Sequence, residues 1–207
     1  MFAEVLNHAK NVDNIMIYIT VISLVFLLGI TAVMIYFVIK FNRKKNPVAT
    51  DIHGNFKLEV LWIAIPTLLA LSMFYYGYKG YTTVHTVPEG AMKVNVTAQM
   101  WKWTFTYDNG LETDTLYVPK GKPVALLLKS LDVNHSLYIP AFREKQDVVF
   151  GKVNNLVIFP ENLGKFDIAC AEYCGLNHSQ MYTKLVVMDP EKFHNWYAAS
   201  NPKEGKK

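Results

Sequence analysis

Charged residues are absent from two long segments in the N-terminal part of the 207-residue chain. Residues 15–39 contain no Asp, Glu, Lys or Arg, and neither do residues 60–78. A helix needs roughly 20 apolar residues to cross a hydrocarbon core of about 30 Å, so each segment is long enough to span a bilayer. The rest of the chain is too polar to bury two such helices, which argues against a soluble protein with two core helices.

The features of a cleavable signal peptide are also missing. The first apolar segment is too long, only Lys10 precedes it, and no small-x-small cleavage site follows, so we predict a retained anchor. The positive-inside rule places the loop between the segments in the cytoplasm and both the N-terminus and everything after Tyr78 outside. The basic residues of this loop are Lys40, Arg43, Lys44, Lys45 and Lys57.

No strong excess of charge occurs in residues 79–207, which hold 15 Lys and Arg against 13 Asp and Glu. This balance, without a basic patch interleaved with aromatic residues, argues against a nucleic-acid partner. The chain also lacks a C-x-x-C-H motif, so we expect no fused haem c domain.

Residues 93–207 are predicted to form an exported β-domain, and residues 1–92 a membrane hairpin with its linker, residues 82–92. Apolar and polar residues alternate in short segments separated by Gly, Pro, Asn and Asp, which is typical of an all-β sandwich or barrel. The predicted strands are 93–98, 100–107, 123–129, 153–159, 165–170 and 183–188. A short helix is predicted over residues 189–199, with Asp189 as N-cap and Pro190 at its first position.

Cysteine is scarce: the only two are Cys170 and Cys174, within the segment CAEYCGLNHSQM. His178 and Met181 follow in the same segment. A thiolate, an imidazole and a weak thioether are the ligands of electron-transfer copper in β-sandwich proteins. Such a site needs a second imidazole, and His135, in DVNHS after the apolar strand 123–129, is the candidate from another loop.

The second cysteine exceeds the needs of a mononuclear copper site, which uses one thiolate. The two thiolates would instead bridge two copper ions, with one histidine terminating each ion and two weak ligands completing the set. The predicted ligands are His135, Cys170, the backbone carbonyl of Glu172, Cys174, His178 and Met181.

Three other interpretations of this segment remain open. A Cys170–Cys174 disulfide suits an exported domain, although it gives no reason for the spacing of His178 and Met181. A zinc site would use both cysteines and His178, although closed zinc sites usually lack methionine. Chance packing of the four side chains in the core is the third.

The motifs CAEYCGLNHSQM and DVNHS resemble the binuclear copper A centre of subunit II of the haem–copper cytochrome c oxidases. The resemblance covers most of the chain, since it includes the two spans, the charged loop and the β-domain. It implies a cupredoxin-like Greek-key β-barrel anchored by a helical hairpin. It also implies that the domain takes electrons from a c-type cytochrome and passes them to haem in subunit I, which reduces oxygen to water and pumps protons.

The resemblance assigns the six predicted ligands to the two coppers. It also implies that the carboxylate of Glu172 binds a Mg²⁺ ion shared with subunit I, the alternative being an ordinary surface acid. Trp101, in MWKWTFTY, matches the tryptophan that receives electrons, and Trp103, expected on the same sheet face, is expected to pack. Glu59 matches a residue near the mouth of a proton pathway, the alternative being a carboxylate favoured by the helix dipole. Asp132 matches an acid on the cytochrome c side, the alternative being a turn-forming residue.

The chain also departs from the family, with Met100 where relatives often have Gln and Phe150 where they often have Pro. Its near-neutral domain is expected to receive electrons from a membrane-attached or weakly basic c-type cytochrome. The expected location is the bacterial plasma membrane, with the copper domain in the periplasm, rather than the mitochondrial inner membrane. Rival families are membrane-anchored copper chaperones with a thioredoxin-like fold, quinol-oxidase relatives that lack the copper ligands, and soluble copper A enzymes such as nitrous oxide reductase.

Overall fold

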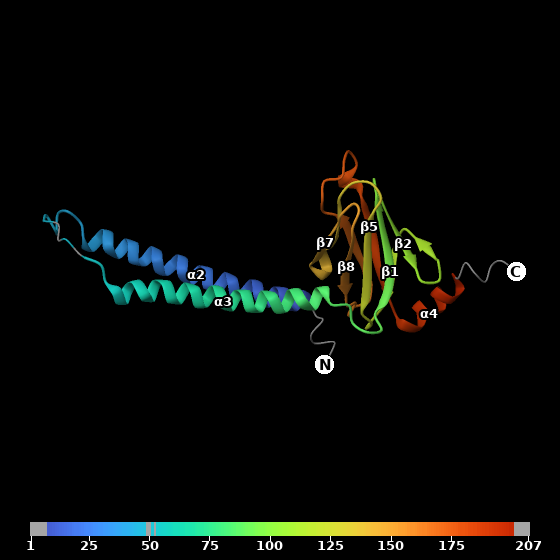
Figure 1. The fold of residues 1–207 in the computed structure, drawn as a ribbon, viewed down its shortest axis with the longest axis horizontal. Helices are drawn as coiled ribbons and strands as arrows, with labels where there is room; N and C mark the ends of the chain where they lie inside the picture. The colour runs from blue at the N-terminus through green and yellow to red at the C-terminus, as the bar shows by residue number, and fades with distance from the viewer. Residues whose placement is uncertain (1–7, 49–50, 52, 201–207) are drawn as a thin grey trace. The chain divides into compact units, whose positions relative to one another are not determined.

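The protein is described by a computed structural model that covers residues 8–48, 51 and 53–200. It divides into two compact units (Figure 1). One is a helical unit of residues 12–79, and the other is built mainly from the residues that follow Lys79.

Two long helices form the helical unit: α2 (His8–Lys40) and α3 (Phe56–His85). Each contains a stretch that is long and apolar enough to cross a membrane, Val12–Lys40 and Phe56–Thr82, and neither stretch is buried by the rest of the chain. Both helices therefore extend beyond the predicted spans, and the first four residues of the expected linker belong to α3. The helices are joined by a hydrogen bond of 2.7 Å between the hydroxyls of Tyr18 and Ser72.

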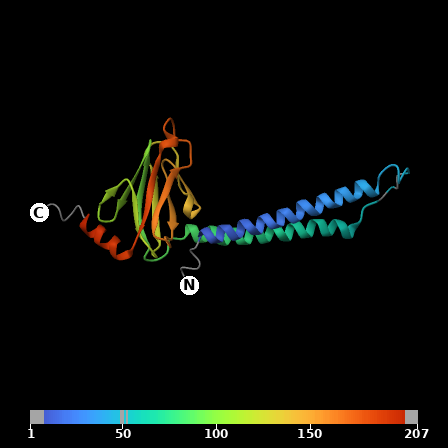
Figure 2. The ribbon, with the colours of Figure 1, turned by 180° about the vertical axis from the view of Figure 1, so that it is seen from behind.

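Ten strands form a sandwich of two five-stranded sheets, seen from both sides in Figures 1 and 2. One sheet has the order β3 (Glu112–Thr113), β2 (Lys102–Tyr107), β1 (Met92–Gln99), β5 (Val124–Ser130) and β8 (Val153–Ile158). The other has the order β4 (Leu116–Pro119), β10 (Tyr182–Met188), β9 (Gly164–Cys170), β6 (His135–Ile139) and β7 (Glu144–Val148). The short helices η1 (Pro140–Phe142), η2 (His178–Gln180) and α4 (Pro190–Ala199) complete the unit.

Alternating apolar residues fill the space between the sheets, as the period of two predicts. In β1, Val94, Val96 and Ala98 are at most 1% exposed, whereas the intervening residues lie at the surface. The predicted fold class, two N-terminal membrane helices followed by a cupredoxin-like β-domain, is confirmed. The helix predicted over 189–199 is also observed: the Asp189 carboxylate accepts the N–H groups of Glu191 and Lys192.

Two local predictions were wrong. The segment predicted as a strand from residue 100 begins its strand at Lys102, so Met100 and Trp101 lie in the turn between β1 and β2. His135 was expected in a loop, but it is the first residue of β6. Strands β3, β4, β6 and β7 were not predicted; β3 and β4 have only two and four residues, and β7 is mostly polar.

The topology gathers several strand ends at one end of the sandwich. Strands β1 and β5 run parallel and both finish there, since Ala98 pairs with Ser130. Strand β9 also ends there, because Cys170 lies opposite Leu137, two residues into β6. We call this the ligand end.

Candidate metal centre

The chain from Cys170 to Met181 forms a compact loop between β9 and β10, which we call the ligand loop. The N–H of Cys170 donates to the carbonyl of Met181 at 3.1 Å and closes the base of the loop. Within it, the N–H of His178 donates to the carbonyl of Gly175 at 3.1 Å. Gly175 has φ of 112°, a backbone conformation that glycine adopts without steric cost.

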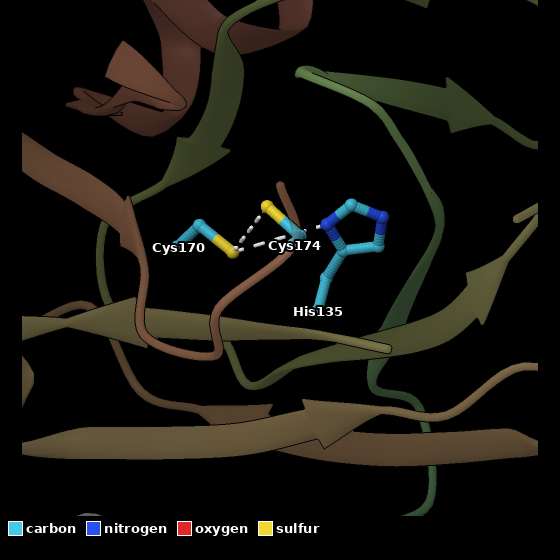
Figure 3. Close-up of side chains that lie close together, drawn as sticks. All are labelled: His135, Cys170 and Cys174. Carbon is cyan, nitrogen blue, oxygen red and sulfur yellow. Dashed lines mark hydrogen bonds between the residues drawn. The ribbon is translucent and has the colours of Figure 1, made fainter. Parts of the chain in front are cut away.

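The two thiols lie at the centre of the candidate site. Cys170 Sγ and Cys174 Sγ are 3.7 Å apart, far beyond the bond length of about 2.05 Å in a disulfide, and both cysteines are free. Cys170 Sγ also lies 3.9 Å from Nδ1 of His135 and 3.3 Å from the carbonyl oxygen of Glu172. Figure 3 shows the side chains of His135, Cys170 and Cys174 pointing toward one another.

The second thiol has its own pair of neighbours. Cys174 Sγ lies 3.5 Å from Nδ1 of His178 and 3.8 Å from Sδ of Met181. The structure therefore brings all six predicted ligands into one cluster, with one imidazole beside each thiol.

His135 is fixed by the acid three residues before it. Its Nε2 lies 2.8 Å from Oδ1 of Asp132, and its ring is fully buried. When Nε2–H donates to this carboxylate, Nδ1 is left unprotonated, and Nδ1 is the atom that faces Cys170. Asp132 lies in the bend between β5 and β6, which agrees with the alternative of a turn-forming residue, and its carboxylate also accepts the N–H of Met100.

Burial divides the cluster into two halves. His135, Cys174 and Met181 are at most 3% exposed, whereas Cys170 is half-buried and Glu172 is exposed. Burial, together with the hydrogen bond to Cys170, raises the pKa of the Cys174 thiol to about 12. A metal bound at this sulfur must therefore displace its proton.

The donor set fits copper better than zinc. The ligand atoms of His135, Cys170 and Cys174 all lie within 4.8 Å of one another, which suits a metal site. The buried thioether of Met181 beside Cys174 would be foreign to a closed zinc site but suits the soft, weak ligand of a copper centre.

Trp101 lies against the ligand loop from the turn between β1 and β2. Its Nε1–H donates to the carbonyl of Cys174 at 3.2 Å. A Cβ atom on Gly175 would lie 3.4 Å from the Trp101 ring, an ordinary contact distance, so it is the φ of 112° rather than this contact that favours glycine here. Trp101 and Trp103 were expected to share a sheet face, but Trp101 lies in the turn and Trp103 in β2. Trp103 is 3% exposed, and its ring makes an edge contact with that of His135.

Glu59 belongs to the helical unit, in the first turn of α3. Its N–H donates to the carbonyl of Asn55 at 2.9 Å, and the Asn55 side chain accepts the N–H of Leu58. This position near the helix N-terminus is the one that the helix dipole favours for a carboxylate.

Sequence reasoning missed one unusual acid, Glu144, the first residue of β7. It is 7% exposed, and burial raises the pKa of its carboxyl to about 7. Nothing in the polar segment EKQDV distinguishes this glutamate from the exposed residues beside it, so no sequence signal could have identified it.

Comparison with known proteins was consistent over both units. The profile of the family described as "Cytochrome C oxidase subunit II, periplasmic domain" matches residues 74–188, and that of the transmembrane domain of the same subunit matches residues 3–79. The chain is 29% identical to cytochrome c oxidase subunit 2 of Synechocystis sp., over 94% of this chain and 74% of the relative. It is 32% identical to the alternative cytochrome c oxidase subunit 2 of Bradyrhizobium diazoefficiens, over 79% of this chain and 70% of the relative.

A solved structure agrees with this result. The periplasmic domain of subunit II of cytochrome oxidase from Bradyrhizobium japonicum aligns with a TM-score of 0.53 at 25% identity, covering 57% of this chain and 99% of that domain. The family profiles, the relatives and the sandwich fold agree, and the chain therefore belongs to the cytochrome c oxidase subunit II family, as a membrane-anchored subunit of a haem–copper oxidase.

Proposed function

We propose that this chain is the electron-input subunit of the oxidase and that its cluster holds a binuclear copper A centre. The observation that carries the proposal is the pair of adjacent thiols, each with an imidazole nitrogen within 3.9 Å. The thiolates would bridge the coppers, the histidines would terminate them, and a thioether and a carbonyl would be the weak ligands. These are Cys170 and Cys174, His135 and His178, and Met181 and Glu172. When bound, the copper pair accepts one electron at a time from a c-type cytochrome and releases it to haem in subunit I.

The chain's own contribution is a framework that limits movement of the donor atoms. Cys170 and His135 belong to paired strands, and Met181 is packed in the core. The protein interior is close-packed, so these side chains have little freedom to rearrange. A small geometry change on electron arrival lowers the cost of the transfer.

Trp101 is proposed as the residue through which electrons arrive. Three exposed apolar residues lie in the segments next to it, and we name them the apolar rim: Met100, Leu131 and Leu176, which are 44%, 52% and 87% exposed. Leu131 is tied to β1 by its N–H bond to the Ala98 carbonyl, and Leu176 follows the glycine that contacts the Trp101 ring. Such a rim suits a c-type cytochrome that docks mainly through apolar contact.

Replacing Trp101 with Phe tests this role. Because Trp101 contributes no ligand atom, we expect the copper absorption spectrum to stay unchanged while the rate of electron input from the cytochrome falls about tenfold or more. Stopped-flow reduction of the purified oxidase measures the rate. Trp62→Phe, in the exposed surface of α3, is the matched control. A rate equal to that of the wild type would remove Trp101 from the route.

Glu172 is proposed to serve two metals. Its carbonyl oxygen faces Cys170, whereas its side chain is exposed and open to another subunit. The carboxylate would bind the Mg²⁺ ion at the contact with subunit I, since Mg²⁺ prefers carboxylate oxygen and water ligands.

The membrane unit supports the remaining assignments. The basic hairpin loop orients the chain with the β-sandwich outside, in the periplasm of a bacterial plasma membrane, and the relatives described above are bacterial. Glu59, at the cytoplasmic start of α3, would lie near the mouth of a proton pathway into subunit I. Subunit I and the other oxidase subunits would complete oxygen reduction and proton pumping.

Metal analysis of the purified oxidase tests the copper centre directly. We expect two coppers per chain beyond those of subunit I, a purple absorption, and an electron-spin signal from one electron shared by both ions. One copper, none, or a Cys170–Cys174 disulfide in the assembled protein would contradict the proposal. A colourless, spin-silent Cu(I) would favour a chaperone, although the β-sandwich lacks the thioredoxin-like fold of that class.

A further inference from the structure

The carboxylate of Asp132 connects two segments that are far apart in the sequence. Oδ2 accepts the N–H of Met100 at 2.7 Å, across 32 residues. Oδ1 accepts the N–H of Val133 at 2.7 Å and lies 2.8 Å from Nε2 of His135. The Asp132 side chain thus contacts both the turn that contains Trp101 and a predicted copper ligand, His135.

Trp101 is tied to the ligand cluster a second time through its indole. The Nε1–H donates to the carbonyl of Cys174, and the ring rests on Gly175, where no Cβ intervenes. Two contacts therefore fix the position of Trp101. The residue before it, Met100, is bonded to Asp132, which also bonds His135, and the indole ring is bonded to the carbonyl of Cys174.

We propose that Asp132 is a positioning residue. It fixes the turn that contains Trp101 relative to the ligand His135, so that the distance between the electron-input residue and the metal ligands stays constant. This inference rests on the proposed function. It differs from a role as a cytochrome-docking acid, because the Asp132 side chain is only 24% exposed and both of its oxygens face internal donors.

The bonds define what each oxygen does. Oδ1 accepts Nε2–H of His135 and so fixes the tautomer that leaves Nδ1 free toward Cys170. Oδ2 holds the backbone of Met100 and thereby the start of the Trp101 turn. An alanine loses all three of these bonds, from Met100, Val133 and His135. An asparagine keeps the volume but replaces one oxygen by an NH2 group, so it loses either the bond from Met100 or the two bonds that Oδ1 accepts from Val133 and His135.

The first experiment needs no copper. Hydrogen exchange of the Met100 amide is measured by mass spectrometry on the full chain, metal-free, for the wild type, Asp132→Ala and Asp108→Asn. Asp108 is an exposed acid in the β2–β3 turn, and its variant controls for the lost charge. We expect exchange to be about tenfold faster in Asp132→Ala alone. Unchanged exchange in Asp132→Ala would overturn the proposal.

The second experiment uses the assembled oxidase. In Asp132→Asn we expect the saturating rate of electron input to fall by about tenfold, the range typical for residues that orient metal ligands, with a changed copper electron-spin spectrum. The KM for the cytochrome should stay within about twofold of wild type, because the residue does not form the docking surface. A raised KM with an unchanged saturating rate and spectrum would show a docking acid and overturn the proposal. If the wild-type oxidase itself lacks the copper pair, the proposed function fails, whereas the hydrogen-exchange result still decides the role of Asp132.

Discussion

At the residue scale, the candidate centre combines donors of very different exposure. His135, Cys174 and Met181 are enclosed by the sandwich, whereas Cys170 is half-buried. Enclosed donors keep water away from the metal and hold their positions by packing. The effect of a substitution at one of these donors should therefore depend on how strongly that donor binds the metal. Loss of a strong donor should lower copper content, and loss of a weak one should change the reduction potential.

Met181 is the weakest of the enclosed side-chain donors, so its replacement should tune the centre without emptying it. For Met181→Leu we expect copper content to stay at the wild-type level, because the thiolates and imidazoles remain. The reduction potential should rise by on the order of 60 mV, which corresponds to a tenfold change in a one-electron equilibrium. Redox titration and metal analysis measure both quantities, with Met188→Leu, at the end of β10, as control. Wholesale loss of copper would refute the weak-ligand assignment.

Glu144 should make stability depend on pH. Burial raises its pKa from 4.5 to about 7, so the folded state favours the protonated carboxyl. The resulting stabilisation is complete below about pH 4.5 and is lost as the pH rises through 7, by up to about 3 kcal/mol. Glu144→Gln, which cannot ionise, should remove this dependence.

Thermal unfolding of the β-sandwich between about pH 5 and 8 measures the effect. The free energy of unfolding of the wild type should fall more steeply with pH than that of Glu144→Gln. The same change at the exposed Glu112 in β3 should leave the wild-type slope intact. Equal slopes for wild type and Glu144→Gln would contradict the burial argument.

At the element scale, the sequence pattern identified the strands with continuous apolar alternation and missed the others. Strands such as β1 and β5 carry an apolar residue at every second position, and this periodicity reports directly on burial. The edge strand β7 has the sequence EKQDV, and β4 has only four residues ending in Pro119, so neither carries such a signal. Pairing with neighbouring strands, which are distant in sequence, determines these elements.

The same distinction applies to the ligand cluster. Five predicted ligands lie between Cys170 and Met181, so their spacing alone suggested a site. His135 was identified by its residue type and its place after an apolar strand. The bond from Met100 to Asp132 depends on how the turn after β1 meets the loop after β5, and no local pattern reports that contact.

Helix α4 provides a prediction at this scale. Asp189 caps its N-terminus, and its aromatic residues pack on the sandwich, with Trp196 and Tyr117 rings 4.5 Å apart. Asp189→Ala should lower the free energy of unfolding by about 1 kcal/mol, because two N–H groups lose their acceptor. Thermal unfolding measures the loss, and Asp108→Ala, in an exposed turn, should have a smaller effect. Equal effects would show that the cap is not what stabilises the helix.

At the scale of the whole molecule, charge is distributed unevenly between the two sides of the membrane. The hairpin loop is strongly basic, whereas residues 79–207 are nearly neutral. The first feature favours a cytoplasmic position for the loop, and the second limits how strongly electrostatic attraction steers a charged partner to the sandwich.

This balance predicts a weak dependence of electron input on salt. Between about 0.02 and 0.2 M ionic strength, the KM for the native cytochrome donor should change by no more than about twofold, since screening has little attraction to remove. Steady-state oxygen consumption by the oxidase measures it. An increase of about tenfold would instead indicate a concentrated acidic docking patch.

The two membrane helices are joined through the side chain of Tyr18. Tyr18 bonds Ser72 and meets the Tyr76 ring, whereas all residues of α2 from Ser23 to Lys40 are exposed, and the two helices diverge toward the loop (Figures 1 and 2). The two helices are therefore close together near Tyr18 and farther apart toward the loop. The apolar spans of both helices are left unburied by the rest of the chain, so lipid or the helices of other oxidase subunits must cover them.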